Sequence, residues 1–112
     1  MKYQITYHVE IPNPSEQLRF SQGTVTSKIF DFPNLINAGE SININFTKYI
    51  NGNQLADPFE YFQISLNIKN VSHNIDGTGG YTEIYASDEV KDQGSLECKL
   101  DNARKVFAKL KG

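Results

Sequence analysis

The sequence predicts one α+β domain over residues 1–112, with about five mainly antiparallel strands and an amphipathic C-terminal helix packed on one face of the sheet. Two observations support this prediction: three stretches alternate apolar and polar residues, and the last part of the chain changes to a helical spacing. Successive side chains on a strand point to opposite faces, so alternation indicates strands with one dry and one wet face. The dry face needs a cover, which the apolar stripe of the helix can provide.

Three strands follow directly from the alternation. The first is predicted over Lys2–Ile11 and ends at two prolines, because proline lacks the backbone donor that a ladder requires. The others are predicted over Ser41–Ile50 and Phe59–Lys69, with Asn51-Gly52 as a strong turn signal between them. The polar residues of these strands are expected to form an open wet face, which comprises Gln4, Thr6, His8, Asn43, Asn45, Thr47, Gln63, Ser65 and Asn67.

Two further strands are less regular. One is predicted over Thr24–Phe32, where a bulge near Lys28 reconciles apolar residues that fall on opposite faces. The other is short and spans Tyr81–Ala86, and the glycine-rich segment before it predicts a loop over Asn70–Gly80. If the strands run up and down in sequence order, this loop lies at the same end of the sheet as the loop Pro33–Glu40.

The C-terminal part of the chain predicts a helix. Ser95 is the expected N-cap, since its hydroxyl can accept a free backbone N–H of the first turn. Cys98 is expected on the side opposite the apolar stripe and is interpreted as a spectator thiol. A short strand through Leu96, Cys98 and Leu100 is the alternative, but it explains fewer positions. The helical stripe consists of Leu96, Leu100, Ala103, Phe107 and Leu110, and Val106 widens it.

The composition is that of an ordinary globular chain. The 112 residues carry a net charge of −2, which argues against a general polyanion-binding protein, because such a protein needs a basic excess. A single cysteine, Cys98, excludes an internal disulfide, and no apolar run is typical of a signal peptide or a membrane helix. We therefore expect a cytoplasmic protein without a membrane partner.

Loop residues provide the candidate binding site. Loops carry function more often than the scaffold that supports them. His73 and Asp76 suit an acid–base pair or a weak cation site, but a solvated hairpin end with asparagines selected for turn geometry explains the same residues without a function. The predicted binding residues are His73, Asn74, Asp76 and Asn37, with Asn34 and Glu40 expected beside them.

Catalytic and metal chemistry have little support in the sequence. His8, His73 and Cys98 are its only imidazole or thiol side chains, and no two of them have the spacing of a metal site. Nothing in the sequence places a nucleophile beside a histidine. We therefore predict no catalytic residue, no metal site and no cofactor.

Three functions are compatible with these observations. The leading hypothesis is a non-enzymatic protein-binding module of the inhibitor, immunity or adaptor type, a profile that suits a phage or mobile-element protein. Its partner is another protein, or a second copy that pairs through a sheet edge or face. The first alternative is a small-ligand binder or weak hydrolase that uses the loop around His73 and Asp76. The second is nucleic-acid binding through the C-terminal helix, because residues 99–112 contain five basic residues and one aspartate.

Overall fold

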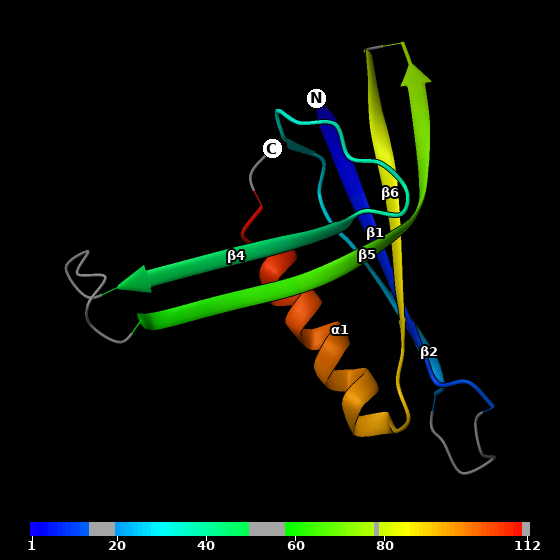
Figure 1. Cartoon of the computed structure of the whole chain (residues 1–112), viewed down its shortest axis with the longest axis vertical. Coiled ribbons are helices and arrows are strands. Elements are labelled where there is room, and N and C mark those ends of the chain that lie inside the picture. Colours follow the sequence, from blue (N-terminus) through cyan, green and yellow to red (C-terminus); the bar gives the residue numbers. More distant parts are fainter. Residues whose placement is uncertain (14–19, 50–57, 78, 111–112) are drawn as a thin grey trace.

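One mixed sheet and one helix make up the part of the chain that the computed structural model describes, residues 1–13, 20–49, 58–77 and 79–110 (Figure 1). The predicted α+β class, with a mainly antiparallel sheet and a C-terminal helix against it, is confirmed. The sheet has six strands rather than about five. In chain order the elements are β1 (Lys2–Glu10), β2 (Gln22–Thr26), β3 (Phe30–Asp31), β4 (Ser41–Tyr49), β5 (Pro58–Asp76), β6 (Gly79–Glu89) and α1 (Gln93–Phe107).

The strand order differs from the up-and-down order that we assumed. The order is β2-β1-β6-β5-β4, and β3 also pairs with β1. All neighbours are antiparallel except β1 and β6, which run parallel. A parallel pair needs a long crossover, and here the chain from β2 to β5 provides it. The first strand therefore lies inside the sheet, and successive loops do not simply alternate between two ends.

The predicted strand Thr24–Phe32 is split in two. β2 ends at Thr26 and β3 begins at Phe30, so the irregularity expected near Lys28 is a break in the ladder. Ser27 compensates for this break, because its Oγ accepts the Ile5 N–H at 2.9 Å and donates to the Lys28 carbonyl at 2.8 Å. The buried backbone amide of Ile5 thus keeps a partner where the ladder is interrupted.

β5 is a long, bent strand that changes partners. Its first part pairs with β4, and its second part pairs with β6 as far as Asp76. The register shifts between Ile68 and Asn70, so Lys69 is the extra residue of a β-bulge, and the strand bends there (Figure 1). The prediction of a loop over Asn70–Gly80 is therefore wrong, because residues 70–76 and 79–80 belong to a β-hairpin.

The helix confirms the predicted stripe but begins earlier than expected. Its N-cap is Asp92 rather than Ser95, because Asp92 Oδ1 accepts the Ser95 N–H at 2.7 Å. This hydrogen bond lowers the pKa of the Asp92 carboxyl. Leu110 lies just beyond the helix and is partly buried against the core. The buried residues of α1 are Leu96, Leu100, Ala103, Val106 and Phe107.

The sheet curves around one side of the helix. α1 contacts β2 and β1 near one end of the strand order and β5 and β4 at the other. Gly23 on β2 permits the close approach of the helix, since a Cβ at this position would lie 2.3 Å from Leu100 Cδ1. The largest fully buried side chains are Tyr3, Tyr7, Ile5, Leu66, Ile68, Ile84, Leu96, Val9 and Val106.

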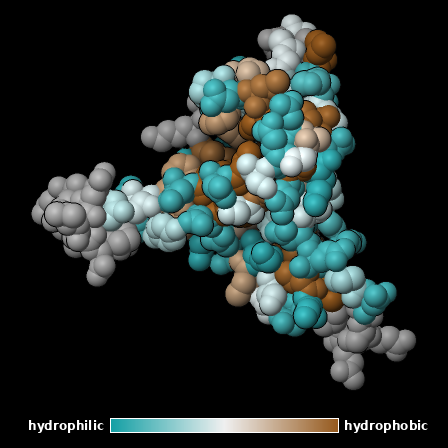
Figure 2. Space-filling model, viewed as in Figure 1, coloured by the Kyte–Doolittle hydropathy of each residue, from teal (hydrophilic) through white to brown (hydrophobic). Residues whose placement is uncertain are grey.

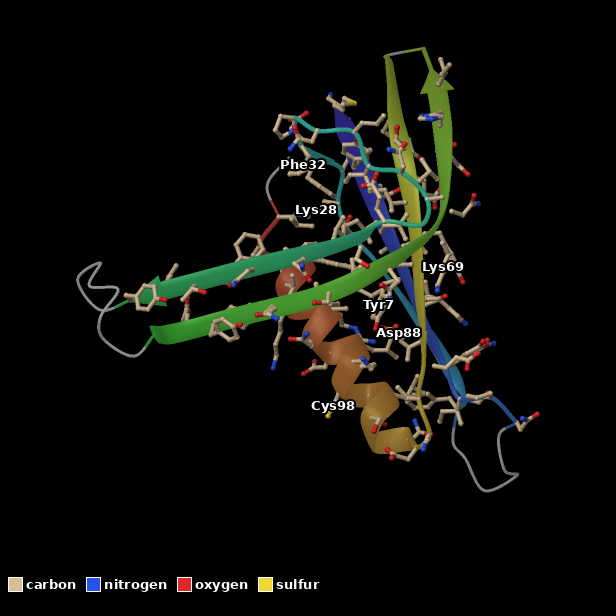
Figure 3. All side chains as sticks on the ribbon, in the orientation of Figure 1. Tyr7, Lys28, Phe32, Lys69, Asp88 and Cys98 are labelled. Carbon is tan, nitrogen blue, oxygen red and sulfur yellow. The ribbon has the colours of Figure 1, made fainter. Side chains whose placement is uncertain are left out.

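A buried tyrosine connects the helix to the middle of the sheet. The Tyr7 hydroxyl donates to Asp88 Oδ2, and Lys99 Nζ on α1 lies 3.7 Å from the same oxygen. Figure 3 shows Tyr7 and Asp88 next to each other beside the helix. Burial raises the pKa of the Tyr7 hydroxyl, and the hydrogen bond to Asp88 and its negative charge add to the shift. The hydroxyl therefore remains a donor well into the alkaline range.

The polar side chains of β4 and β5 are exposed, but they form hydrogen bonds with one another. Ser41 donates to Asn67 Oδ1 at 2.8 Å, and Ser65 donates to Asn43 Oδ1 at 2.6 Å. These bonds cross between β4 and β5 on the expected wet face. The predicted turn at Asn51-Gly52 lies outside the described residues.

Candidate protein-binding groove

An open apolar groove of about 790 Å³ runs along the edge of β4. β4 stands at the end of the strand order, so no strand of the described residues pairs with its outer side. Figure 2 shows hydrophobic surface in the notch between β4 and the segment above it, where Figure 3 places Phe32. The apolar lining consists of Phe30, Phe32, Ile36, Ile42, Ile44, Phe46, Phe62 and Leu110.

The groove exists because α1 leaves β4 partly uncovered. Ile42, Ile44 and Phe46 are half-buried, whereas Ile64 and Leu66 on the neighbouring strand β5 are buried. β4 pairs only with the first part of β5, whereas β6 pairs only with the second part, so β4 lies beyond the bend of the sheet. One helix therefore covers only part of the dry face, and our expectation that it supplies the whole cover is wrong at β4.

The wall opposite β4 is held in place by Tyr3. The Tyr3 hydroxyl donates to the Asn34 carbonyl at 2.8 Å and accepts the Ile36 N–H at 3.3 Å. The ring of Tyr3 packs against Phe30 and Phe32, with centroid distances of 6.2 and 6.4 Å. These contacts attach the wall of the groove to β1 in the interior of the sheet.

Three charged residues lie together at one place in the lining. Glu60 Oε2 is 3.4 Å from Lys48 Nζ and 3.6 Å from Lys109 Nζ. Lys109 Nζ also lies 4.8 Å from the ring centroid of Phe62. Two lysines and one carboxylate leave a positive excess at this place, whereas the lining as a whole is balanced, since it also contains Asp31.

The backbone groups of β4 alternate between β5 and the free edge. Just before β4, the Glu40 carbonyl accepts the Ile68 N–H at 2.9 Å, and the pairing continues without a shift as far as Lys48. In an antiparallel pair, the N–H and C=O of one residue point to the same side, and successive residues alternate. The even-numbered residues therefore bond to β5. The residues whose N–H and C=O groups point to the free edge are Ser41, Asn43, Asn45 and Thr47.

The structure places three of the predicted binding residues on the β5–β6 hairpin rather than in a loop. The Nδ1 of His73 lies 3.0 Å from Thr82 Oγ1 on the opposite strand. Asn74 pairs with Tyr81 and is half-buried. The Asp76 backbone is in the strand, but its side chain lies outside the described part of the chain, so an acid–base pair with His73 stays a prediction.

Asn37, the fourth predicted residue, lies in the segment before β4. Its Nδ2 donates to Glu40 Oε1 at 2.9 Å. This segment is bonded to β5 near Ile68, where the Gly39 N–H donates to the Ile68 carbonyl at 2.8 Å. His73 is five residues farther along β5, or about 16 Å at the rise of a strand. In the described ranges, the hydrogen bond of the Asn37 side chain is therefore to Glu40 and not to a residue of the hairpin.

Several cations of α1 and of the residues just after it face carboxylates. Lys99 Nζ lies 3.7 Å from Asp88, Lys105 Nζ lies 3.2 Å from Asp101, and Lys109 contacts Glu60 as described above. These pairs reduce the positive field that a nucleic acid would meet. Lys111 lies outside the described residues.

Thiol chemistry, metal binding and membrane insertion have little support in the described residues. Cys98 is an exposed free thiol on α1, as expected from its place opposite the stripe (Figure 3). In residues 1–13, 20–49, 58–77 and 79–110, no group of three or more His, Cys, Asp or Glu side chains is arranged to hold a metal ion. No helix in the same ranges is long and apolar enough to cross a membrane.

In comparisons with known proteins, this chain matches no family model, no curated protein and no solved structure. The groove is therefore assigned from its geometry. Sequence reasoning missed it because Ile42, Ile44 and Phe46 have the pattern of ordinary core residues. Their alternation indicates one dry face, but it contains no information on the bend in β5 that carries β4 away from the rest of the sheet.

Proposed function

We propose that this protein is a non-enzymatic protein-binding module, of the inhibitor, immunity or adaptor type, that adds an extended segment of a protein partner to the edge of β4. The supporting observation is that outward-pointing backbone groups and an apolar groove occur along the same edge. In strand addition, main-chain hydrogen bonds provide affinity, and pockets for alternate side chains provide specificity. A cytoplasmic location is part of the proposal.

The sequence of this edge favours strand addition. Proteins usually protect an edge strand with charged residues, proline or a bulge. From Ser41 to Thr47, β4 has no charged residue and no proline, and its register with β5 is regular. An added strand would form hydrogen bonds with Asn43, Asn45 and Thr47 and would place every second side chain in the groove. The preferred segment therefore alternates apolar and polar residues.

The two other candidate functions have weaker support from the geometry. A ligand site around His73 lacks a described partner for its imidazole other than Thr82. A nucleic-acid site on α1 would have to compete with the carboxylates that already face Lys99, Lys105 and Lys109. Neither arrangement combines a free backbone edge with apolar lining.

Peptides displayed on phage provide the test. The protein is immobilised at low density, so that its copies do not meet, and selected peptides are then measured by fluorescence polarisation. We expect the selected sequences to carry apolar residues at alternate positions and to bind in the micromolar range.

The variant Asn45→Pro removes an N–H that points to the free edge and makes no ladder bond to β5. It should weaken peptide binding at least tenfold. Asn45→Ala is the matched control, because it keeps the N–H and should retain binding. Failure to select any peptide, or equal binding to the wild-type and Asn45→Pro proteins, would contradict the proposal.

A further inference from the structure

We infer that the segment which occupies the β4 edge is β4 of a second copy of the chain, in a two-fold pair centred on Ile44. The inference rests on the proposed function, because it uses the same edge and the same groove. Residues 40–48 have the sequence Glu-Ser-Ile-Asn-Ile-Asn-Phe-Thr-Lys. This segment has opposite charges at its two ends and apolar residues at every second position between them.

The segment is complementary to itself when it pairs in the antiparallel direction. A two-fold axis at Ile44 places residue 40 opposite residue 48 of the partner, and residue 42 opposite residue 46. On the groove face, Glu40 then meets the partner's Lys48, Ile42 meets the partner's Phe46, and Ile44 meets the partner's Ile44. On the other face, polar residues meet polar residues, since Ser41 lies opposite the partner's Thr47 and Asn43 opposite the partner's Asn45.

Neighbouring registers lack this complementarity. With the axis at Asn43, Phe46 would lie opposite the partner's Glu40. With the axis at Asn45, Ile42 would lie opposite the partner's Lys48. Each shift places a charged side chain against an apolar one twice, because the two-fold axis repeats every contact. The axis at Ile44 is the central register that matches charge with opposite charge and apolar with apolar.

The backbone supports the same register. An axis at Ile44 brings the outward N–H and C=O groups of Asn43 opposite those of the partner's Asn45, so both chains can exchange ladder hydrogen bonds. Figure 1 shows β4 and the first part of β5 extending together to one side of the helix. Glu40 and Lys48 are both exposed, and the Lys48 side chain is 64 % exposed although its Nζ lies 3.4 Å from Glu60 Oε2. The partner's Glu40 would therefore add a second carboxylate to Lys48.

The test is sedimentation equilibrium of the wild-type protein and its charge-reversal variants, from low micromolar to millimolar concentration. We expect a monomer–dimer equilibrium for the wild-type protein. Lys48→Glu and Glu40→Lys should each raise the dimer dissociation constant about tenfold or more, because each change replaces two symmetry-related attractions by repulsions. An equimolar mixture of the two variants should dimerise again, since one variant has two acidic ends and the other two basic ends.

Three controls separate the effect of charge at the edge from other effects. Lys105→Glu on α1 changes the net charge by as much as Lys48→Glu does, but away from the edge, and it should leave the dissociation constant unchanged. Melting curves of each variant show that it is folded, and the double variant Glu40→Lys/Lys48→Glu should dimerise like the wild-type protein.

A wild-type protein that stays monomeric at millimolar concentration would overturn the inference. So would single variants that dimerise as tightly as the wild-type protein, or a mixture that does not recover dimerisation. The proposed function fails separately: selected peptides that bind the monomeric Lys48→Glu protein would support strand addition even if the chain does not pair with itself. If those peptides fail to bind and the wild-type protein stays monomeric, both proposals fail.

Discussion

The two edges of the sheet differ in length, regularity and cover. β4 forms one edge with nine consecutive residues. The opposite edge consists of β2 and β3, with five and two residues, and Ser27 lies in the break between them. At this second edge, the Ser27 Oγ accepts the Ile5 N–H in place of a backbone carbonyl, and the helix packs closely against Gly23. The same sheet thus has one interrupted edge against the helix and, beside an open groove, one edge that is regular from Ser41 to Lys48.

This difference indicates which edge is available for binding. A short, interrupted edge offers few successive backbone groups to another chain, whereas a long, regular edge offers a complete ladder. The helix strengthens the contrast, because its Leu100 packs against Gly23 of β2, whereas Ile42, Ile44 and Phe46 of β4 stay half-buried. Substitutions on the two sides should therefore differ in their effect on stability and on association.

The largest expected difference concerns the apolar side chains. Leu100 is buried against β2. The substitution Leu100→Ala should therefore lower the free energy of unfolding by about 2–5 kcal/mol. Ile44→Ala, at a half-buried position of β4, should cost only about 1 kcal/mol. Urea denaturation in dilute solution measures both values. Equal costs would show that β4 is covered as completely as β2.

The second prediction concerns the break in the interrupted edge. Ser27→Ala leaves the buried Ile5 N–H without its acceptor, so the free energy of unfolding should fall by about 1–3 kcal/mol. Ser41→Ala removes a hydroxyl that bonds to Asn67 on the exposed face of β4, and its effect should stay within about 0.5 kcal/mol. The same denaturation assay compares them, and a Ser27 effect as small as that of Ser41 would remove the special role of Ser27.

The third prediction concerns the anchor of the helix that covers β2. Tyr7→Phe should lower the free energy of unfolding by about 1–2 kcal/mol, because Asp88 loses a buried donor. The pKa of Tyr7 is raised in the folded state, so its contribution is complete below the unfolded pKa of about 10 and is lost as pH rises toward the folded pKa. The wild-type protein should therefore lose its advantage over Tyr7→Phe in alkaline solution. A constant difference at all pH values would contradict this role.

The smallest expected effect lies at the start of the helix. The folded pKa of Asp92 is lowered, so the stability that its ionised form contributes is present above the unfolded pKa of about 3.9 and is lost as pH falls through the folded pKa. Asp92→Asn keeps an oxygen acceptor for the Ser95 N–H but does not titrate. The difference in melting temperature between the two proteins should therefore shrink on acidification from neutral pH. A difference that grows instead would show that the carboxylate is not stabilised in the fold.

Local patterns predicted most of the elements correctly. The alternation of Tyr3, Ile5 and Tyr7 indicated a strand with one buried face, and all three side chains are buried. The helical stripe from Leu96 to Phe107 indicated the face of α1 that packs on the sheet. In these segments the residue spacing alone determines which side chains face the core, so no knowledge of the neighbouring strands was needed.

The errors arose where distant residues decide the structure. The parallel pairing of β1 with β6 joins residues that are more than 70 positions apart in the sequence, and no local pattern contains this information. The bulge at Lys69 shifts the alternation by one residue, so Ile68 and then Val71 face inward, and the polar residues between and after them suggested a loop. The N-cap was assigned three residues too late, because Asp92 and Ser95 are both suitable capping residues.

The candidate site was sought among polar loop residues, although the groove is formed mainly by apolar ones. Ile42, Ile44 and Phe46 gave a correct strand, but alternation does not show how much of a dry face one helix can cover. The hairpin residues His73 and Asn74 remain a predicted binding site. In the described residues, the group that the His73 imidazole contacts is the hydroxyl of Thr82, which does not supply acid–base chemistry.

Site-resolved amide hydrogen exchange tests the central claim, that the outer edge of β4 binds a strand. In dilute solution, we predict slow exchange at Ile42, Ile44 and Phe46, which bond to β5, and fast exchange at Asn43, Asn45 and Thr47. As the protein concentration rises, or a selected peptide binds, the second set should become protected while the first set changes little. Protection of both sets in dilute solution, or fast exchange at Asn43, Asn45 and Thr47 under all conditions, would contradict the account.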